Sequence, residues 1–296
     1  MLFHMKINLS KNVTYDKILI GKLYQEKYFF NNEYPQDDKV YDLISSYYSI
    51  DKKFIAIGYG SADVLNRIIG NLSLDDLFVI EPTFHGAERF CRYHNVMYIP
   101  WKYKNFNQID IEDIPSNCNV YIANPNGNNG HAFSLDSLKK LLKRSKLLII
   151  DEAYIDYGGE SIIKERASNL IVLRTFSKSL GLPDIRCGFA VASENNINLI
   201  RSTELPYCST GRTEKILKKY INQIPDTVER MIDARNFVES KFECIKSKGN
   251  YVLLNKKYES LFKDKAIISY RDKFLRIALT NKEFFEKIWE ENLKKH

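Results

Sequence analysis

The fold class of this chain is indicated by two short stretches, LLIIDEAY at residues 147–154 and LIVLRTFSKSLG at residues 170–181. Each begins with four apolar residues, which is typical of a buried strand, and each continues directly into polar residues. Ligands of open α/β sheets bind beyond the carboxyl ends of the strands. Asp151 and Lys178 therefore become candidate site residues, an acid and an amine at neighbouring strand ends.

Similar apolar runs occur on both sides of these stretches, with helical patterns between them. The further runs are residues 54–57, 77–80, 96–99, 120–123 and 189–192. Strands that alternate with helices form parallel sheets that are buried on both faces. The sequence therefore predicts an α/β fold with a mostly parallel, seven-stranded sheet.

The pattern changes beyond Pro206. A long helical segment is expected over residues 213–242, followed by short strands near 251–254 and 275–279 and a charged helix from Lys282. No repeat or flexible linker divides the chain. We predict an N-terminal arm over residues 1–30, a large domain over 31–205 and a small α+β domain over 206–296. The arm is expected to lie on the small domain or on a partner chain.

Composition narrows the functional classes. The 296 residues are 44% hydrophobic and 27% charged, as in ordinary folded proteins. The net charge of +7 comes from scattered basic residues, so a nucleic-acid partner is not expected. No apolar run is long enough to span a membrane, and no signal peptide is evident. The five cysteines are widely spaced and odd in number, which predicts a protein without disulfides in the reducing cytoplasm. The five histidines lack the spacing of a zinc site, so no metal is expected.

A possible phosphate site follows the first apolar run. The turn at residues 58–63 leads into a helical pattern, with Ser61 expected as the N-cap of a helix whose free amides can bind an anion. The turn lacks the glycine spacing of a dinucleotide site and the lysine of a P-loop. Ser177, Lys178 and Arg186 could together neutralise a phosphate and leave one amine near a carbonyl group.

The segments IDEAYIDY (150–157), NLIVLRTFSK (169–178) and GLPDIRCGF (181–189) resemble the histidinol-phosphate aminotransferase family. Supporting pieces occur in the family's order at residues 34–35, 58–63, 82–84, 124–126, 250–253 and 275–277. The resemblance covers most of the chain. It implies the fold type I of enzymes that depend on pyridoxal 5'-phosphate (PLP).

The resemblance also implies roles for individual residues. Lys178 would hold PLP covalently and move the substrate proton, while Asp151 would pair with the ring nitrogen and keep it protonated. The remaining contacts implied are Asn124 and Tyr154 on the ring oxygen, Phe84 on the ring face, and Ser61, Ala62, Ser177 and Arg186 on the phosphate. Tyr34 would reach the phosphate from a second subunit, which implies a homodimer.

The substrate side is implied less completely. Arg276 resembles the family arginine that clamps the substrate carboxylate, for which a guanidinium is well shaped. Arg271 resembles a second arginine near a distal phosphate, although a surface charge beside Asp272 is the alternative. Asn12 matches an N-terminal asparagine near the substrate. The chain departs from the family where NPNGNNG (124–130) replaces NPNNPTG, and it is shorter than typical members.

Four functions remain open at this stage. The first is an aminotransferase that moves an amino group between an amino acid or amino-phosphate donor and a 2-oxo acid. The second is a decarboxylase of a phosphorylated amino acid, because the bond that is broken depends on how the substrate is placed. The third is a non-catalytic relative that binds a partner. The fourth, a nucleotide-binding protein, is disfavoured by the incomplete glycine motif.

Overall fold

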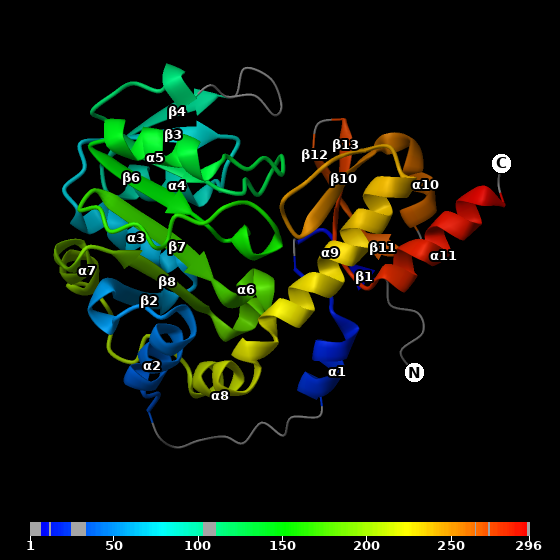
Figure 1. Ribbon diagram of the computed structural model, residues 1–296, viewed down its shortest axis with the longest axis horizontal. Coiled ribbons are helices and arrows are strands. Elements are labelled where there is room, and N and C mark those ends of the chain that lie inside the picture. Colours follow the sequence, from blue (N-terminus) through cyan, green and yellow to red (C-terminus); the bar gives the residue numbers. More distant parts are fainter. Residues whose placement is uncertain are drawn as a thin grey trace.

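The computed structural model describes residues 7–11, 13–24, 34–102, 111–263, 265–271 and 273–294. Its main feature is a seven-stranded sheet in the order β2-β8-β7-β6-β5-β3-β4 (Figure 1). The strands are β2 (Ile55–Tyr59), β3 (Asp76–Glu81), β4 (Met97–Lys102), β5 (Asn119–Ala123), β6 (Leu147–Asp151), β7 (Leu170–Thr175) and β8 (Cys187–Ala192). β8 alone runs opposite to the other six strands. The predicted mostly parallel sheet is confirmed, and each of the seven apolar runs contributes to one of its strands. The run at residues 96–99 was expected to be a buried strand, but β4 lies at the sheet edge and has no buried residue.

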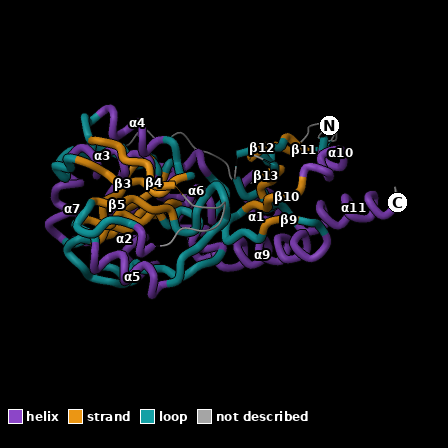
Figure 2. Tube along the Cα trace, turned by 90° about the horizontal axis from the view of Figure 1, so that it is seen from above, coloured by secondary structure: helices purple, strands orange, loops and turns teal. Residues whose placement is uncertain are grey.

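Helices cover both faces of this sheet, because successive strand side chains point to opposite faces and both sets are apolar (Figure 2). One face packs against α3 (Ser61–Asn71), α4 (Gly86–Tyr93) and α7 (Glu194–Arg201). The other packs against α2 (Asp37–Tyr48), α5 (Leu135–Arg144) and the short α6 (Phe176–Ser179). Tyr121 and Ile149 belong to the first face.

The C-terminal part forms a smaller α+β layer, as predicted. Its four-stranded sheet has the order β12-β13-β10-β9. The elements are α8 (Gly211–Tyr220), α9 (Ile224–Lys241), β9 (Cys244–Ile245), β10 (Tyr251–Asn255), α10 (Glu259–Phe262), β11 (Ala266–Ile267), β12 (Ser269–Arg271), β13 (Phe274–Ala278) and α11 (Lys282–Leu293). Short 3-10 turns lie at η1 (Lys52–Phe54), η2 (Ile111–Asp113), η3 (Ile155–Tyr157), η4 (Pro183–Ile185), η5 (Ile221–Gln223) and η6 (Lys256–Tyr258).

The helical segment expected over residues 213–242 is present, but it is not one continuous α-helix. The segment is divided into α8 and α9 by the 3-10 turn η5. Pro225 lies in the first turn of α9. Proline has no N–H for the hydrogen bond to a preceding turn, so it is tolerated at the start of a helix but not inside one.

The described N-terminal residues lie against the C-terminal layer. β1 (Ile7–Asn8) pairs in parallel with β11, and α1 (Lys17–Tyr24) follows it. Asp16 is buried and forms an ion pair with Arg230 of α9. Of the two positions expected for the arm, the described part takes the one on its own chain (Figure 1). The domain boundaries at residues 30 and 205 stay predictions. No helix among the described residues is long and apolar enough to cross a membrane.

Candidate active site

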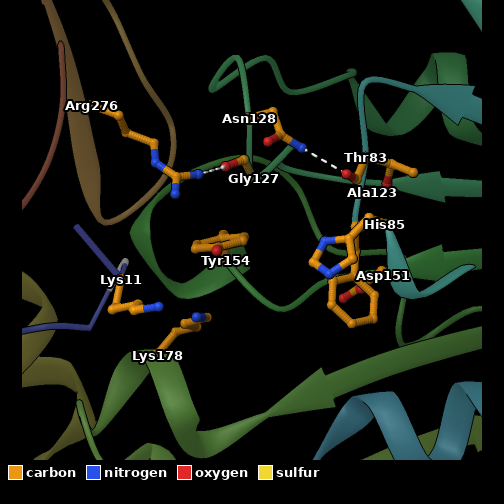
Figure 3. Close-up of a pocket in the computed structure, with 11 residues that line it drawn as sticks. Lys11, Thr83, His85, Ala123, Gly127, Asn128, Asp151, Tyr154, Lys178 and Arg276 are labelled. Carbon is orange, nitrogen blue, oxygen red and sulfur yellow. Dashed lines mark hydrogen bonds between the residues drawn. The ribbon is translucent and has the colours of Figure 1, made fainter. Parts of the chain in front are cut away.

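Two adjoining cavities lie at the carboxyl ends of the strands of the seven-stranded sheet. Cavity A has a volume of about 270 Å³ and is lined by Lys11, Thr83, Phe84, His85, Ala123, Gly127, Asn128, Asp151, Tyr154, Lys178 and Arg276 (Figure 3). Cavity B, of about 320 Å³, is lined by Gly60, Ser61, Ala62, Phe84, Asp151, Ala153, Tyr154, Thr175, Ser177, Lys178, Pro183 and Arg186. Four residues line both cavities: Phe84, Asp151, Tyr154 and Lys178. These four side chains therefore lie at the centre of the candidate site.

Lys178 is held by its backbone. It lies in α6, directly after β7, and its carbonyl accepts hydrogen bonds from the Thr14 hydroxyl (2.9 Å) and the Tyr157 hydroxyl (2.6 Å). Its Nζ lies 5.4 Å from the centre of the Tyr154 ring. Because Thr14 belongs to the N-terminal segment, that segment and the sheet together fix the backbone from which the Lys178 side chain extends.

Asp151 ends β6 and is buried. Its carboxylate accepts hydrogen bonds from the Tyr121 hydroxyl (2.9 Å) and from the Ala153 amide (3.0 Å). Burial raises the pKa of the Asp151 carboxyl, whereas these hydrogen bonds and the nearby Lys178 charge oppose that rise. A cationic group placed next to this carboxylate would compensate its burial.

Tyr121 was not expected from the sequence. It lies two residues before Ala123 on β5, so both side chains point to the face on which Asp151 lies. Burial, followed by the nearby Asp151 charge, raises the pKa of the Tyr121 hydroxyl, which therefore remains a donor. Strand alternation was the signal that could have identified it.

The phosphate side of the site is the start of α3. Ser61 and Ala62 are the first two residues of this helix, but the N-cap is Gly60 and not Ser61 as predicted. Gly60 has a φ of 78°, and a Cβ there would lie 2.7 Å from Nη2 of Arg186. That nitrogen donates to the Tyr59 carbonyl at 2.8 Å. The glycine allows a guanidinium to approach a helix N-terminus closely. A cation beside the free amides of a helix start forms a site that suits an anion.

Two neighbours complete this side. Ser177 is buried in α6, and its backbone amide donates to the Thr175 hydroxyl at 3.2 Å. Gly188 of β8 lies against the turn, where a Cβ would lie 2.1 Å from the Ser61 nitrogen. The sequence identified Ser177 but not Thr175, although Thr175 lies two residues after the same apolar run.

Arg276 lies on the opposite side, in β13, and is largely buried. Its Nε donates to the Ser269 hydroxyl (3.2 Å), and its Nη atoms contact the carbonyls of Gly127 and Ser10 (both 3.4 Å). These carbonyls and the hydroxyl orient the guanidinium at the edge of cavity A. An incoming carboxylate would therefore meet an oriented cation.

Asn124 directly follows β5, and its contact with the cofactor stays a prediction. Its Nδ2 atom is buried and has no hydrogen-bond partner among the described residues. Asn124 lines neither cavity, is fully buried, and accepts a hydrogen bond from the Phe133 amide at 2.8 Å. Gly127 and Asn128, later in the same loop, line cavity A instead.

Three predicted residues are not brought into the cavities by the described structure. Tyr34 is 73% exposed, lines neither cavity, and stacks on Tyr207 with ring centres 4.4 Å apart. Arg271 is placed only by its backbone, which pairs with Phe274 in the β12–β13 hairpin. Asn12 lies outside the described residues.

The donor set fits the PLP that the resemblance implies. A buried carboxyl whose charged form gains from a nearby cation suits a ring nitrogen that carries a proton, and the α3 amides with Arg186 suit a phosphate. Phe84, which is 40% exposed, lies between the cavities and offers a ring face. Lys178 is the amine that both cavities share.

Comparisons with known proteins agree with this chemistry. The family model for aminotransferase class I and II matches residues 35–293. The histidinol-phosphate aminotransferase of Ruminiclostridium cellulolyticum is 30% identical over 249 residues, which cover 75% of this chain and 69% of the relative.

Solved structures share the fold. The histidinol-phosphate aminotransferase from Clostridium acetobutylicum gives a TM-score of 0.75 at 20% identity, over 98% of this chain and 100% of that one. The L-threonine-O-3-phosphate decarboxylase from Porphyromonas gingivalis gives a TM-score of 0.71 at 18% identity, over 97% of this chain and 99% of that one. At these identities the two likenesses show the fold alone.

Proposed function

This chain belongs to the class I and II aminotransferase family, and from that premise we propose that Lys178 holds the cofactor. We also propose that the amino donor is an amino acid or an amino phosphate related to histidinol phosphate. The protein is a PLP-dependent aminotransferase, which moves an amino group between an amino acid and a 2-oxo acid. The observation that carries the residue assignment is the meeting of Lys178, Asp151 and Tyr154 at the junction of the two cavities.

In this proposal each side chain has one task. When bound, PLP supplies an electron sink for the charge that develops at the substrate α-carbon. The Lys178 amine takes the proton from that carbon, and Asp151 keeps a proton on the ring nitrogen. Ser177, Arg186 and the amides of Ser61 and Ala62 bind the phosphate.

The other contacts orient cofactor and substrate. Tyr154 donates to the ring oxygen and Phe84 packs on the ring face. Arg276 binds the substrate carboxylate. Arg271 and Asn12 remain proposed substrate contacts. Asn124 remains a proposed donor to the ring oxygen, which is supported by its buried Nδ2 atom having no hydrogen-bond partner among the described residues.

The assembly and location are also proposed. A homodimer would bring Tyr34 of one subunit to the phosphate of the other, and the exposed ring of Tyr34 supports this. The five free cysteines support a cytoplasmic location, because reducing compartments keep thiols unpaired.

Decarboxylation of a phosphorylated amino acid is the alternative within the same fold. Its support is the fold shared with the decarboxylase from Porphyromonas gingivalis. The two reactions differ in product, since decarboxylation releases carbon dioxide and transamination leaves the amino group on the cofactor.

The test is the visible absorption spectrum of the purified protein with PLP, before and after addition of histidinol phosphate, glutamate, phosphothreonine and alanine. We expect a protein-linked cofactor band that Lys178→Ala removes and that Lys17→Ala, a change of an exposed lysine on α1, leaves intact. A donor that bleaches the band without releasing carbon dioxide identifies transamination. A spectrum that is the same for Lys178→Ala and the unchanged protein would refute the assignment of Lys178.

A further inference from the structure

A buried arginine lies behind the phosphate side of the site. Arg67 is on α3, the helix that begins with Ser61 and Ala62, and it is only 6% exposed. It lines neither cavity, and the proposed function gives it no task. Because a buried guanidinium is costly unless its donors are paired, its partners indicate what it holds in place.

The Arg67 guanidinium joins several segments around the start of α3. Its Nη2 atom donates to the Ile57 carbonyl of β2 and lies 3.4 Å from Oδ2 of Asp63 on its own helix. Its Nη1 atom donates to the Glu204 carboxylate at 3.1 Å. Glu204 also accepts a hydrogen bond from the Tyr41 hydroxyl of α2 at 2.9 Å. Arg67 is therefore the common partner of β2, α3 and the segment after α7.

Asp63 connects Arg67 to the turn that precedes the helix. Its Oδ2 atom accepts a hydrogen bond from the Tyr59 amide at 3.1 Å. The carbonyl of the same Tyr59 accepts from Arg186, which lines cavity B. A Cβ at Gly58 would clash with Oδ2 of Asp63 and lie 2.5 Å from Nη2 of Arg67, so the glycine permits this packing. The turn and the phosphate arginine thus depend on where Asp63 is held.

The charge of Asp63 opposes phosphate binding unless it is offset. Its carboxylate lies in the first turn of α3 and interacts with the same positive helix end that would bind a phosphate. Two anions at one helix end repel each other. Arg67 contacts this carboxylate from the side away from the cavities, so it keeps the hydrogen bond to the turn and reduces the repulsion.

We propose that Arg67 is a positioning residue for the cofactor phosphate. It holds the turn at residues 57–60 against the start of α3, and it offsets the negative charge of Asp63. It acts through Asp63 and the Tyr59 backbone and touches neither cofactor nor substrate. This inference rests on the proposed function, in which the start of α3 binds the phosphate.

The test compares PLP with pyridoxal, which has the same ring and aldehyde but no phosphate. Dissociation constants of both are measured on the purified apoprotein by titration of the cofactor band. Their ratio, pyridoxal over PLP, is the phosphate preference. Arg67→Gln should lower this preference about 10-fold and leave pyridoxal binding within about twofold, because only the phosphate loses a favourable site.

Asp63→Asn should have the opposite effect. The amide still offers an oxygen to the Tyr59 N–H, but the negative charge is gone, so the phosphate preference should rise about two- to fivefold. Adding Asp63→Asn to Arg67→Gln should recover at least about threefold of the lost preference. The control is Arg92→Gln, which removes an exposed ion pair to Glu88, four residues earlier on α4, and should not alter the preference.

Equal weakening of PLP and pyridoxal in Arg67→Gln would overturn the inference, because a merely structural role affects both. A preference in Asp63→Asn that is unchanged or lower would also overturn it, and this result decides alone if Arg67→Gln does not fold. If the unchanged protein forms no Lys178-dependent band with PLP, the proposed function itself fails. An intact band with unchanged preferences in these variants refutes only the role of Arg67.

Discussion

At the scale of single residues, the buried Asp151 carboxyl lowers the stability of the apoprotein and also contributes to PLP binding. Because burial raises the pKa of its carboxyl above the ordinary 3.8, the folded apoprotein holds this proton more tightly than the unfolded chain does. Its contribution to stability therefore falls as pH rises from the ordinary pKa through the raised pKa, and it stays low above that range. Asp151→Asn removes this pH-dependent cost.

We predict that Asp151→Asn raises the melting temperature of the apoprotein at pH 7 and that the gain disappears at low pH. The same variant should bind PLP about 10-fold or more weakly, since an amide does not carry the charge that holds a ring proton. Thermal unfolding across pH and PLP titration provide the two measurements. A less stable apoprotein with unchanged PLP affinity would contradict both roles.

Tyr121, which lines neither cavity, donates a hydrogen bond to the Asp151 carboxylate. Tyr121→Phe removes one hydrogen bond to the charged form, so the pKa of Asp151 should rise further and PLP affinity should fall by about 3- to 10-fold. The pH at which the cofactor spectrum changes should also move. Tyr98→Phe is the matched control, because Tyr98 donates to Glu81 and lines neither cavity. Equal spectra and affinities for both variants would exclude this role for Tyr121.

At the scale of elements, the phosphate side depends on how closely β8 approaches the start of α3. Gly188→Ala would place a Cβ 2.1 Å from the Ser61 nitrogen, so the helix start must move. We expect a loss of about 1 to 3 kcal/mol in the free energy of unfolding, typical of overpacking, and weaker PLP binding.

Gly21→Ala is the control for this prediction. Position 21 lies within α1, and a Cβ there meets nothing within 4 Å. The change should stabilise the helix by up to about 1 kcal/mol and leave PLP binding unchanged. Urea unfolding measures both variants, and a Gly188→Ala protein with unaltered stability and PLP affinity would show that the contact is not needed.

At the scale of the whole molecule, the proposed homodimer predicts complementation between two inactive variants. If Tyr34 acts on the partner subunit, a mixed dimer of Lys178→Ala and Tyr34→Ala subunits has one site with both residues intact. Mixing the two proteins under subunit exchange should restore transaminase activity that neither shows alone. Sedimentation should give a dimer for both. A dimer without restored activity would argue that Tyr34 acts within its own chain or not at all.

The sequence by itself determined the fold and the centre of the site. Short apolar runs predict buried strands because burial on both faces requires apolar residues at every position, and all seven runs lie in one sheet. The residues after those runs, Asp151 and Lys178 among them, meet because parallel strands end at the same edge. The sequence pattern also placed Ser177 and Arg186 near a phosphate, whereas the role of Tyr154 came from the family resemblance. All three residues line cavity B.

The tertiary structure decided what local patterns do not encode. Lys11 reaches cavity A because Leu9 pairs with residues 267 and 278, far along the chain. Tyr121 supports Asp151 because two strands pair in one register. A local pattern reports whether a side chain is buried, whereas its neighbours depend on long-range pairing and on the direction of each side chain. The cofactor centre was therefore largely predictable, and the substrate side was not.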